Sequence, residues 1–219
     1  MAPALANPQT RKAVFASLVE QLVRLHALRP PGQWGSRELI DTARALWSGQ
    51  SHRPGFVWSR SLDARWKELG EILARDPRRV LSHCDLNPSN LLWDGTRVWL
   101  VDWDQAAFMH PYLDLVVSSN FLNLGDAEVA SLVEAQEGGP LSAEQREVLQ
   151  ALREVTRLIF GCILVGLVPD LTGLPWRTAE EVPSLGECYA RMRAGTLDPR
   201  SAQGQAMMGH AVLKQALVA

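Results

Sequence analysis

Apolar residues recur with the period of an α-helix along most of the 219-residue chain. Over residues 11–28 they fall three or four positions apart, and a Pro-Pro pair then stops the pattern. The same spacing predicts further helices over residues 37–47, 62–74, 112–122 and 127–137. Ser142 and Gln145 form a capping-box pattern that predicts the start of a long apolar helix ending near Val168.

Between residues 79 and 108 the helical period is lost. The segment RVLSH is typical of a strand, and LLW and RVWLVDW flank Asp94-Gly95, a dipeptide that favours a tight hairpin turn. From about Ala179 we expect shorter helices, with LDPRSAQGQ as a mobile connection. The pattern therefore predicts a mainly α chain with a small β-hairpin element, an α+β protein. We expect a single domain over residues 1–219, helical over 11–75 and 111–219, with the polar segment 79–108 between.

The overall composition excludes several classes of protein. Twenty-two basic and 24 acidic residues give a net charge of −2, so no nucleic acid or membrane partner is expected. Cys84, Cys162 and Cys188 are widely spaced, which argues against a disulfide framework or a structural zinc site and favours a cytoplasmic location. The first residues lack the apolar core of a signal peptide, and the apolar run over 158–168 is too short to span a bilayer.

The segment VLSHCDLNPSNLLWDGTRVWLVDWDQAAF concentrates short oxygen-bearing side chains at fixed spacings. Asp85 and Asn90 lie on a predicted loop, and Asp102 ends the strand that follows the hairpin turn. The hairpin can bring Asn90 and Asp102 together, and their oxygens are hard ligands suited to Mg²⁺ on phosphate groups. Asp85 is then free to accept a proton from a substrate hydroxyl.

This H-x-D-x-x-x-x-N pattern, followed by a strand ending in Asp, resembles the catalytic and metal-binding loops of protein kinase-like enzymes. The sequence D-W-D over residues 102–104 resembles the small-molecule branch: aminoglycoside phosphotransferases and choline, ethanolamine or thiamine kinases. Weaker similarity extends over most of the chain, including LVEQLVRLHAL, which resembles the helix after the hinge of that family. The resemblance implies the large, C-terminal lobe of a kinase-like fold.

The resemblance also implies roles for individual residues. Asp85 would be the catalytic base, Asn90 and Asp102 would hold Mg²⁺ on the phosphates of ATP, and Asp104 would be a second acid near the metal. His83 would brace the loop, and Asp114 would support it from HPYLDL. Simpler interpretations exist: His83 as a packed strand-end residue, Asp104 as a solvated surface acid, and Asp114 as a favourable charge at a helix start.

Five tryptophans could contribute to a box for a quaternary amine, because indole faces attract desolvated cations. They are Trp34, Trp47, Trp58, Trp66 and Trp176. Filling the core is the more usual role of large aromatic side chains. Trp176, in a loop after the long helix, is the best candidate for contact with the acceptor.

Kinase-like enzymes place a small lobe before the hinge, with a Gly-rich loop and a strand lysine. Here the post-hinge helix begins almost at Met1, and Lys12, Lys67 and Lys214 lack a strand context. We therefore expect the large lobe alone, with an exposed apolar face that invites a lobe-supplying chain or a homo-oligomer.

Three functions are compatible with these features. The first is an ATP- and Mg²⁺-dependent phosphotransferase acting on a hydroxyl of a small amine, sugar or aminoglycoside-like acceptor. The second is a non-catalytic, pseudokinase-like binding lobe, which the missing lysine and Gly-rich loop favour. The third is an unrelated Mg²⁺-dependent transferase that uses Asp102-x-Asp104, although this leaves Asp85 and Asn90 unexplained.

Overall fold

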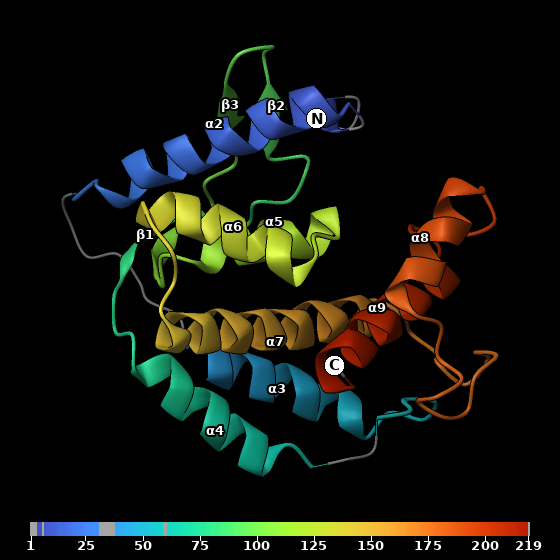
Figure 1. The fold of residues 1–219 in the computed structure, drawn as a ribbon. Coiled ribbons are helices and arrows are strands. Elements are labelled where there is room, and N and C mark those ends of the chain that lie inside the picture. Colours follow the sequence, from blue (N-terminus) through green and yellow to red (C-terminus); the bar gives the residue numbers. More distant parts are fainter. Residues whose placement is uncertain (1–3, 6, 31–37, 59–60, 219) are drawn as a thin grey trace. The chain divides into compact units, whose positions relative to one another are not determined.

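The computed structural model describes residues 4–5, 7–30, 38–58 and 61–218. Most of these residues are helical (Figure 1), and the helices are α2 (Pro8–His26), α3 (Leu39–Ser51), α4 (Asp63–Ala74), α5 (Leu113–Leu122), α6 (Asp126–Glu137), α7 (Ala143–Gly166), α8 (Leu185–Arg193) and α9 (Ala202–Leu217). Four short strands lie between α4 and α5: β1 (Val80–Ser82), β2 (Leu91–Trp93), β3 (Val98–Leu100) and β4 (Ala107–Met109). The prediction of a mainly helical chain with a small β element is confirmed. None of the described helices is long and apolar enough to cross a bilayer.

Residue contacts divide the chain into two compact units. Unit 1 comprises residues 1–37 and 72–152, and unit 2 comprises residues 38–71 and 153–219. All four strands and the polar segment belong to unit 1, so that unit is described first. The expected single domain over residues 1–219 stays a prediction.

Helix α2 organises unit 1, because it contacts β1, β3 and α6 (Figure 1). Its apolar face buries Leu18 and Leu22, which are 1% and 0% exposed. Val129 and Val133 of α6 are fully buried as well. Each such side chain contributes roughly 1.5–3 kcal/mol when it leaves water, so the helical spacing in the sequence directly forms this core.

The strands form two antiparallel pairs. In the predicted hairpin, β2 pairs with β3 with Leu91 opposite Leu100, and Gly95 takes a φ of +105° in the turn. Asp94 closes this turn by accepting hydrogen bonds from the main-chain N–H groups of Thr96 and Arg97, both at 2.8 Å. Asp94 is thus the turn residue that the sequence indicates.

The other pair, β1 with β4, was not predicted. Its register places Val80 opposite Met109 and Ser82 opposite Ala107. The pairing brings the residues that follow β1 towards the start of α5, which follows β4 after a short connection. The hairpin is tied to α2 by Ser17, whose hydroxyl accepts the main-chain N–H of Val98 at 2.9 Å.

Unit 2 contains α3, α8 and α9 together with most of α4 and the second part of α7. Arg53 donates hydrogen bonds to the main-chain oxygens of Val165, Val168 and Pro169 and so satisfies carbonyls at the C-terminal end of α7. The prediction of a mobile connection over 197–205 is wrong for its second half, because residues 202–205 are helical. Ser201 caps α9 by accepting the N–H of Gly204 at 3.0 Å, so the helix starts inside that segment.

Candidate active site

The polar loop over residues 83–90 begins where β1 ends. Asp114, in the first turn of α5, accepts hydrogen bonds from the main-chain N–H groups of His83 at 2.9 Å and Cys84 at 2.8 Å. The Asp114 side chain is fully buried. Cys84 has a φ of +66°, a backbone conformation that costs a non-glycine residue on the order of 1 kcal/mol. The Asp114 contacts hold the loop in this conformation immediately before Asp85.

Two side-chain amides hold the carboxylate of Asp85. The Nδ2 of Asn87 lies 3.1 Å from each Asp85 carboxylate oxygen, and the Nδ2 of Asn90 lies 2.9 Å from Oδ2. The same Asn90 nitrogen also donates to the main-chain oxygen of Asp85 at 2.8 Å. Because the Asn90 nitrogen makes both contacts with Asp85, the amide oxygen of Asn90 is left for another partner, and the Ser89 hydroxyl lies 3.4 Å from that oxygen. Asp85 is half-buried, and these contacts fix the orientation of its carboxylate.

The structure also brings Asn90 and Asp102 together along the hairpin. The main-chain N–H of Val101 donates to the main-chain oxygen of Asn90 at 3.1 Å, one step beyond the Leu91–Leu100 pair. Asp102 follows directly, is exposed, and has a φ of +65°. The described part of the chain contains three non-glycine residues with positive φ. Two of them lie at the predicted site: Cys84 precedes Asp85, and Asp102 is itself a predicted site residue.

His83 connects the two parts of this site. Its Nε2 lies 2.9 Å from the main-chain oxygen of Val101 and must carry the proton, because that oxygen can only accept. Its ring packs against Trp103 with ring centroids 4.6 Å apart. These contacts are what a bracing residue requires, although the role itself stays a prediction.

Asp104 and Trp176 are not placed in the site by any described contact. Asp104 is exposed, which is compatible both with a metal-associated acid and with a solvated surface acid. Trp176 belongs to unit 2, is 3% exposed, and packs edge-on against His210 at 5.6 Å between centroids. A surface acceptor would not reach this indole face in the present conformation, so contact with the acceptor stays a prediction.

The other tryptophans proposed for an amine box are also mostly buried. Trp47, Trp58 and Trp66 are 5%, 4% and 2% exposed, as expected for core-filling side chains. Trp34 lies outside the described residues. Trp47 and Trp66 nevertheless line a pocket of about 630 Å³ within unit 2, together with polar residues that include Asp63.

Three residues near the candidate site are not predicted from the sequence: Asn87, Ser118 and His26. Asn87 belongs to the quoted HCDLNPSN segment, but its contact with Asp85 depends on the loop conformation and has no signal in spacing alone. Ser118 donates its hydroxyl proton to the main-chain oxygen of Leu86 at 3.0 Å and so ties the loop to α5. The Nε2 of His26, in the last turn of α2, lies 4.0 Å from the Asp114 carboxylate. Both contacts join segments far apart in sequence.

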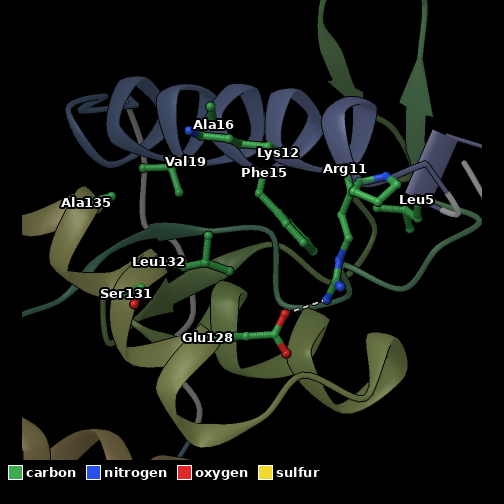
Figure 2. Close-up of a pocket in the computed structure, with 11 residues that line it drawn as sticks. Leu5, Arg11, Lys12, Phe15, Ala16, Val19, Glu128, Ser131, Leu132 and Ala135 are labelled. Atoms are coloured by element: carbon green, nitrogen blue, oxygen red, sulfur yellow. Dashed lines mark hydrogen bonds and ion pairs between the residues drawn. The ribbon is translucent and has the colours of Figure 1, made fainter.

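A further pocket in unit 1, of about 670 Å³, lies between α2 and α6 (Figure 2). Its lining is largely apolar, with Phe15 and Leu132 on facing helices, and an ion pair of 2.6 Å joins Arg11 to Glu128. None of the predicted site residues lines it. The pocket therefore does not belong to the candidate active site.

A second polar cluster surrounds the ends of β1 and β4. His110 is 4% exposed, its Nε2 lies 3.1 Å from the Asp76 carboxylate, and burial lowers its pKa from 6.5 to about 4. Burial opposes ionisation of Asp76, but hydrogen bonds from Arg78 outweigh it and lower the Asp76 pKa to about 2. Burial also raises the pKa of Tyr112 to about 12. The cluster thus contains a neutral histidine beside a carboxylate at neutral pH.

Comparison with known proteins gives one family and several more distant structures. The family described as "Phosphotransferase enzyme family" matches residues 2–155. A 3-deoxy-D-manno-octulosonic acid kinase from Stenotrophomonas maltophilia (strain K279a) is 43% identical over 78 residues, which is 35% of this chain and 26% of that protein. The chain therefore matches about a quarter of the length of this curated relative.

Two solved structures resemble nearly the whole chain. One is a choline/ethanolamine kinase family protein from Mesorhizobium loti, with a TM-score of 0.64, 18% identity, and coverage of 93% of this chain and 67% of that one. The other is a choline kinase from Streptococcus pneumoniae, with a TM-score of 0.58, 15% identity, and coverage of 94% and 64%.

These structures confirm the predicted kinase-like fold, while the family match extends over more than half of the chain and includes α2, the polar loop and the hairpin. The family signature thus covers the segment in which Asp85, Asn90 and Asp102 lie. The chain belongs to the phosphotransferase enzyme family.

Proposed function

We propose that this protein transfers the γ-phosphoryl group of ATP to a hydroxyl group of a small sugar or amine acceptor. The observation that carries the proposal is the fixed carboxylate of Asp85, which the amides of Asn87 and Asn90 orient from two sides. The same Asn90 is joined through its main chain to the residue before Asp102. A candidate base and a candidate phosphate site are therefore parts of one connected loop and hairpin.

Asp85 would act as the base. A carboxylate offers about four lone-pair sites, and the two amides leave room for one more donor. A substrate hydroxyl bound there would be held in one orientation and would lose its proton to the carboxylate as phosphoryl transfer proceeds. Main-chain hydrogen bonds from His83 and Cys84 to Asp114 would keep Asp85 in place during that step.

We expect the residues around Asp102 to hold a magnesium ion because of the chemistry of their side chains. The amide oxygen of Asn90 and the exposed carboxylates of Asp102 and Asp104 are hard oxygen donors, and Mg²⁺ commonly takes few protein ligands besides phosphate oxygens and water. No group of three or more His, Cys, Asp or Glu side chains that could hold a metal is found among the described residues, and the proposed site instead combines the Asn90 amide with two carboxylates. When bound, Mg²⁺ would neutralise charge on the nucleotide phosphates.

The acceptor class rests on the relatives. The kinase from Stenotrophomonas maltophilia is named for an acidic sugar. One structural neighbour is named for choline and ethanolamine, and the other for choline alone. Since the chain covers only part of each, both a sugar and an amine alcohol remain acceptors to be tested. Trp176 stays the proposed acceptor-side aromatic, on the condition that its loop opens.

We further propose that another lobe or chain covers the outer face of the hairpin. Leu92 and Trp99 are opposite each other across β2 and β3, and both are 50% exposed. A second lobe or a second copy of this chain would remove this apolar pair from water. No disulfide joins the three cysteines, which lie among the described residues, and this supports a reducing cytoplasm as the proposed location.

The test is calorimetric titration of the protein with ATP in the presence and absence of Mg²⁺. Asp102→Ala should abolish Mg²⁺-dependent binding, whereas Asp41→Asn, an exposed acid on α3, should leave it unchanged. Phosphoryl transfer is then measured with 3-deoxy-D-manno-octulosonic acid, choline and ethanolamine. A folded protein that binds no nucleotide and phosphorylates none of them would favour the non-catalytic binding lobe.

A further inference from the structure

The carboxylate of Asp114 is short of partners for a buried charge. Its side chain is completely buried, and one main-chain N–H group donates to each oxygen, from Cys84 to Oδ1 and from His83 to Oδ2. A buried carboxylate is stabilised only when cations or several donors surround it. In the described part of the chain, no lysine or arginine forms an ion pair with Asp114.

His26 is placed to supply the missing partner. Its side chain is 10% exposed, and its Nε2 is buried and has no hydrogen-bond partner among the described residues. That nitrogen lies 4.0 Å from the Oδ2 of Asp114, longer than a hydrogen bond but within reach of a small side-chain movement. His26 is also the last residue of α2, where the helix dipole favours a cation.

Asp114 is linked in turn to Asp85, the proposed base, through the main chain of the polar loop. Asp114 holds the N–H groups of His83 and Cys84, and Cys84 with its positive φ immediately precedes Asp85. A shift of the Asp114 carboxylate would therefore change the position of Asp85 relative to an acceptor hydroxyl. Misplacement of a reacting group by about 1 Å can lower a rate by about 100-fold.

We infer that His26 is a positioning residue for the phosphoryl transfer proposed above: it donates to Asp114 and thereby fixes the loop that carries Asp85. This inference rests on the proposed function only where it concerns the rate of transfer. Its structural part, that His26 orders the N–H groups of His83 and Cys84, holds whichever acceptor the protein uses.

The test compares His26→Leu, which has no donor, with His26→Gln, whose amide can still donate. Arg24→Gln, an exposed change on the same helical turn, is the matched control. Hydrogen exchange of the His83 and Cys84 amides is measured first, because it requires no activity. In His26→Leu we expect these two amides to exchange at least about tenfold faster than in the wild type. In His26→Gln and Arg24→Gln the exchange rates should be close to those of the wild type.

Alkylation of Cys84 by iodoacetamide gives a second probe of the same loop. Burial raises the pKa of Cys162 to about 12 and that of Cys188 to about 11, so the half-buried Cys84 should be the reactive thiol among the three. His26→Leu should change the alkylation rate of Cys84, and His26→Gln should restore it. If the Leu variant does not fold, His26→Asn replaces it, because its shorter side chain cannot span the distance to Asp114.

Turnover distinguishes positioning from a general loss of stability. With Mg²⁺, ATP and whichever acceptor is phosphorylated, His26→Leu should lower kcat about tenfold or more with little change in KM. Unchanged exchange at His83 and Cys84 in a folded Leu variant would overturn the inference. Faster exchange spread evenly over unit 1 would overturn it too. A wild-type protein that transfers no phosphate would refute the proposed function, while the exchange measurement would still decide the role of His26.

Discussion

The side-chain nitrogen of Asn90 lies 2.9 Å from the Oδ2 of Asp85 and 2.8 Å from its main-chain oxygen. One amide thus fixes both the carboxylate and the backbone of the candidate base. The main-chain oxygen of Asn90 meanwhile accepts the N–H of Val101, beside Asp102. A single residue therefore sets the spacing between the candidate base and the candidate metal ligand, which explains why the two chemistries occur on one short segment.

Asp85→Asn should abolish phosphoryl transfer, with a loss of at least about 10²–10⁴-fold in kcat, because an amide cannot accept the proton of the acceptor. The amide oxygen of the variant can still accept from Asn90, and the half-buried Asn87 can turn to water, so the free energy of unfolding should change by about 1 kcal/mol or less. Coupled-enzyme detection of ADP and urea unfolding measure the two effects. A variant that kept the full rate would remove Asp85 from the mechanism.

Asn87→Ala tests a residue whose role the sequence pattern alone does not indicate. Loss of its two contacts with the Asp85 carboxylate, each 3.1 Å, should lower kcat about tenfold and leave the KM for ATP nearly unchanged. Steady-state kinetics measure the two constants separately. Ser118→Ala, which loosens the loop at Leu86 without touching Asp85, should have a smaller effect. An unchanged kcat in Asn87→Ala would show that Asn90 alone orients the base.

Much of the fold could be predicted because the local pattern and the final structure agree. The apolar positions that predict α2 form its buried face, which includes Leu18 and Leu22. Ser142 and Gln145 form the expected reciprocal cap of α7. The hairpin turn at Asp94-Gly95 also depends only on local conformation. In each case neighbouring residues alone determine the element.

The parts that could not be predicted depend on contacts between distant segments. Nothing in the three-residue segment Ala107–Met109 indicates that it pairs with β1, yet this pairing brings Asp114 to the polar loop. The contact between His26 and Asp114 likewise joins residues 88 positions apart. The loop position of Trp176 predicts an acceptor contact, but the burial of its side chain depends on packing within unit 2 that the sequence does not specify.

Asp114→Asn should destabilise the protein by about 2–3 kcal/mol. The Asp114 oxygens accept two main-chain N–H groups, and an amide offers only one oxygen, so one buried donor loses its partner. Urea unfolding followed by tryptophan fluorescence measures this change. Asp126→Asn, in the first turn of α6 and exposed, is a control with the same chemical change. Equal stability of the two variants would contradict a structural role for the Asp114 carboxylate.

The free energy of unfolding should also depend on pH through His110. Burial lowers its pKa from 6.5 to about 4, so between these pH values the unfolded chain binds a proton that the folded protein does not. Stability from this group is therefore full above about pH 6.5 and decreases as the pH falls to about 4, by up to roughly 3 kcal/mol. Asp76 affects the free energy of unfolding at lower pH. Because its pKa is lowered to about 2 in the folded protein, the stability that it contributes is lost between about pH 4 and 2.

Urea unfolding at a series of pH values from 7 to about 4.5 separates these contributions, since Asp76 stays ionised over this range. His110→Asn removes the titrating ring and leaves a polar side chain beside Tyr112, so its stability should decrease less steeply with falling pH than that of the wild type. Some slope should remain, because burial also lowers the pKa of His210 in unit 2. Parallel curves for the wild type and His110→Asn would show that His110 carries a proton in the folded state as readily as in the unfolded chain.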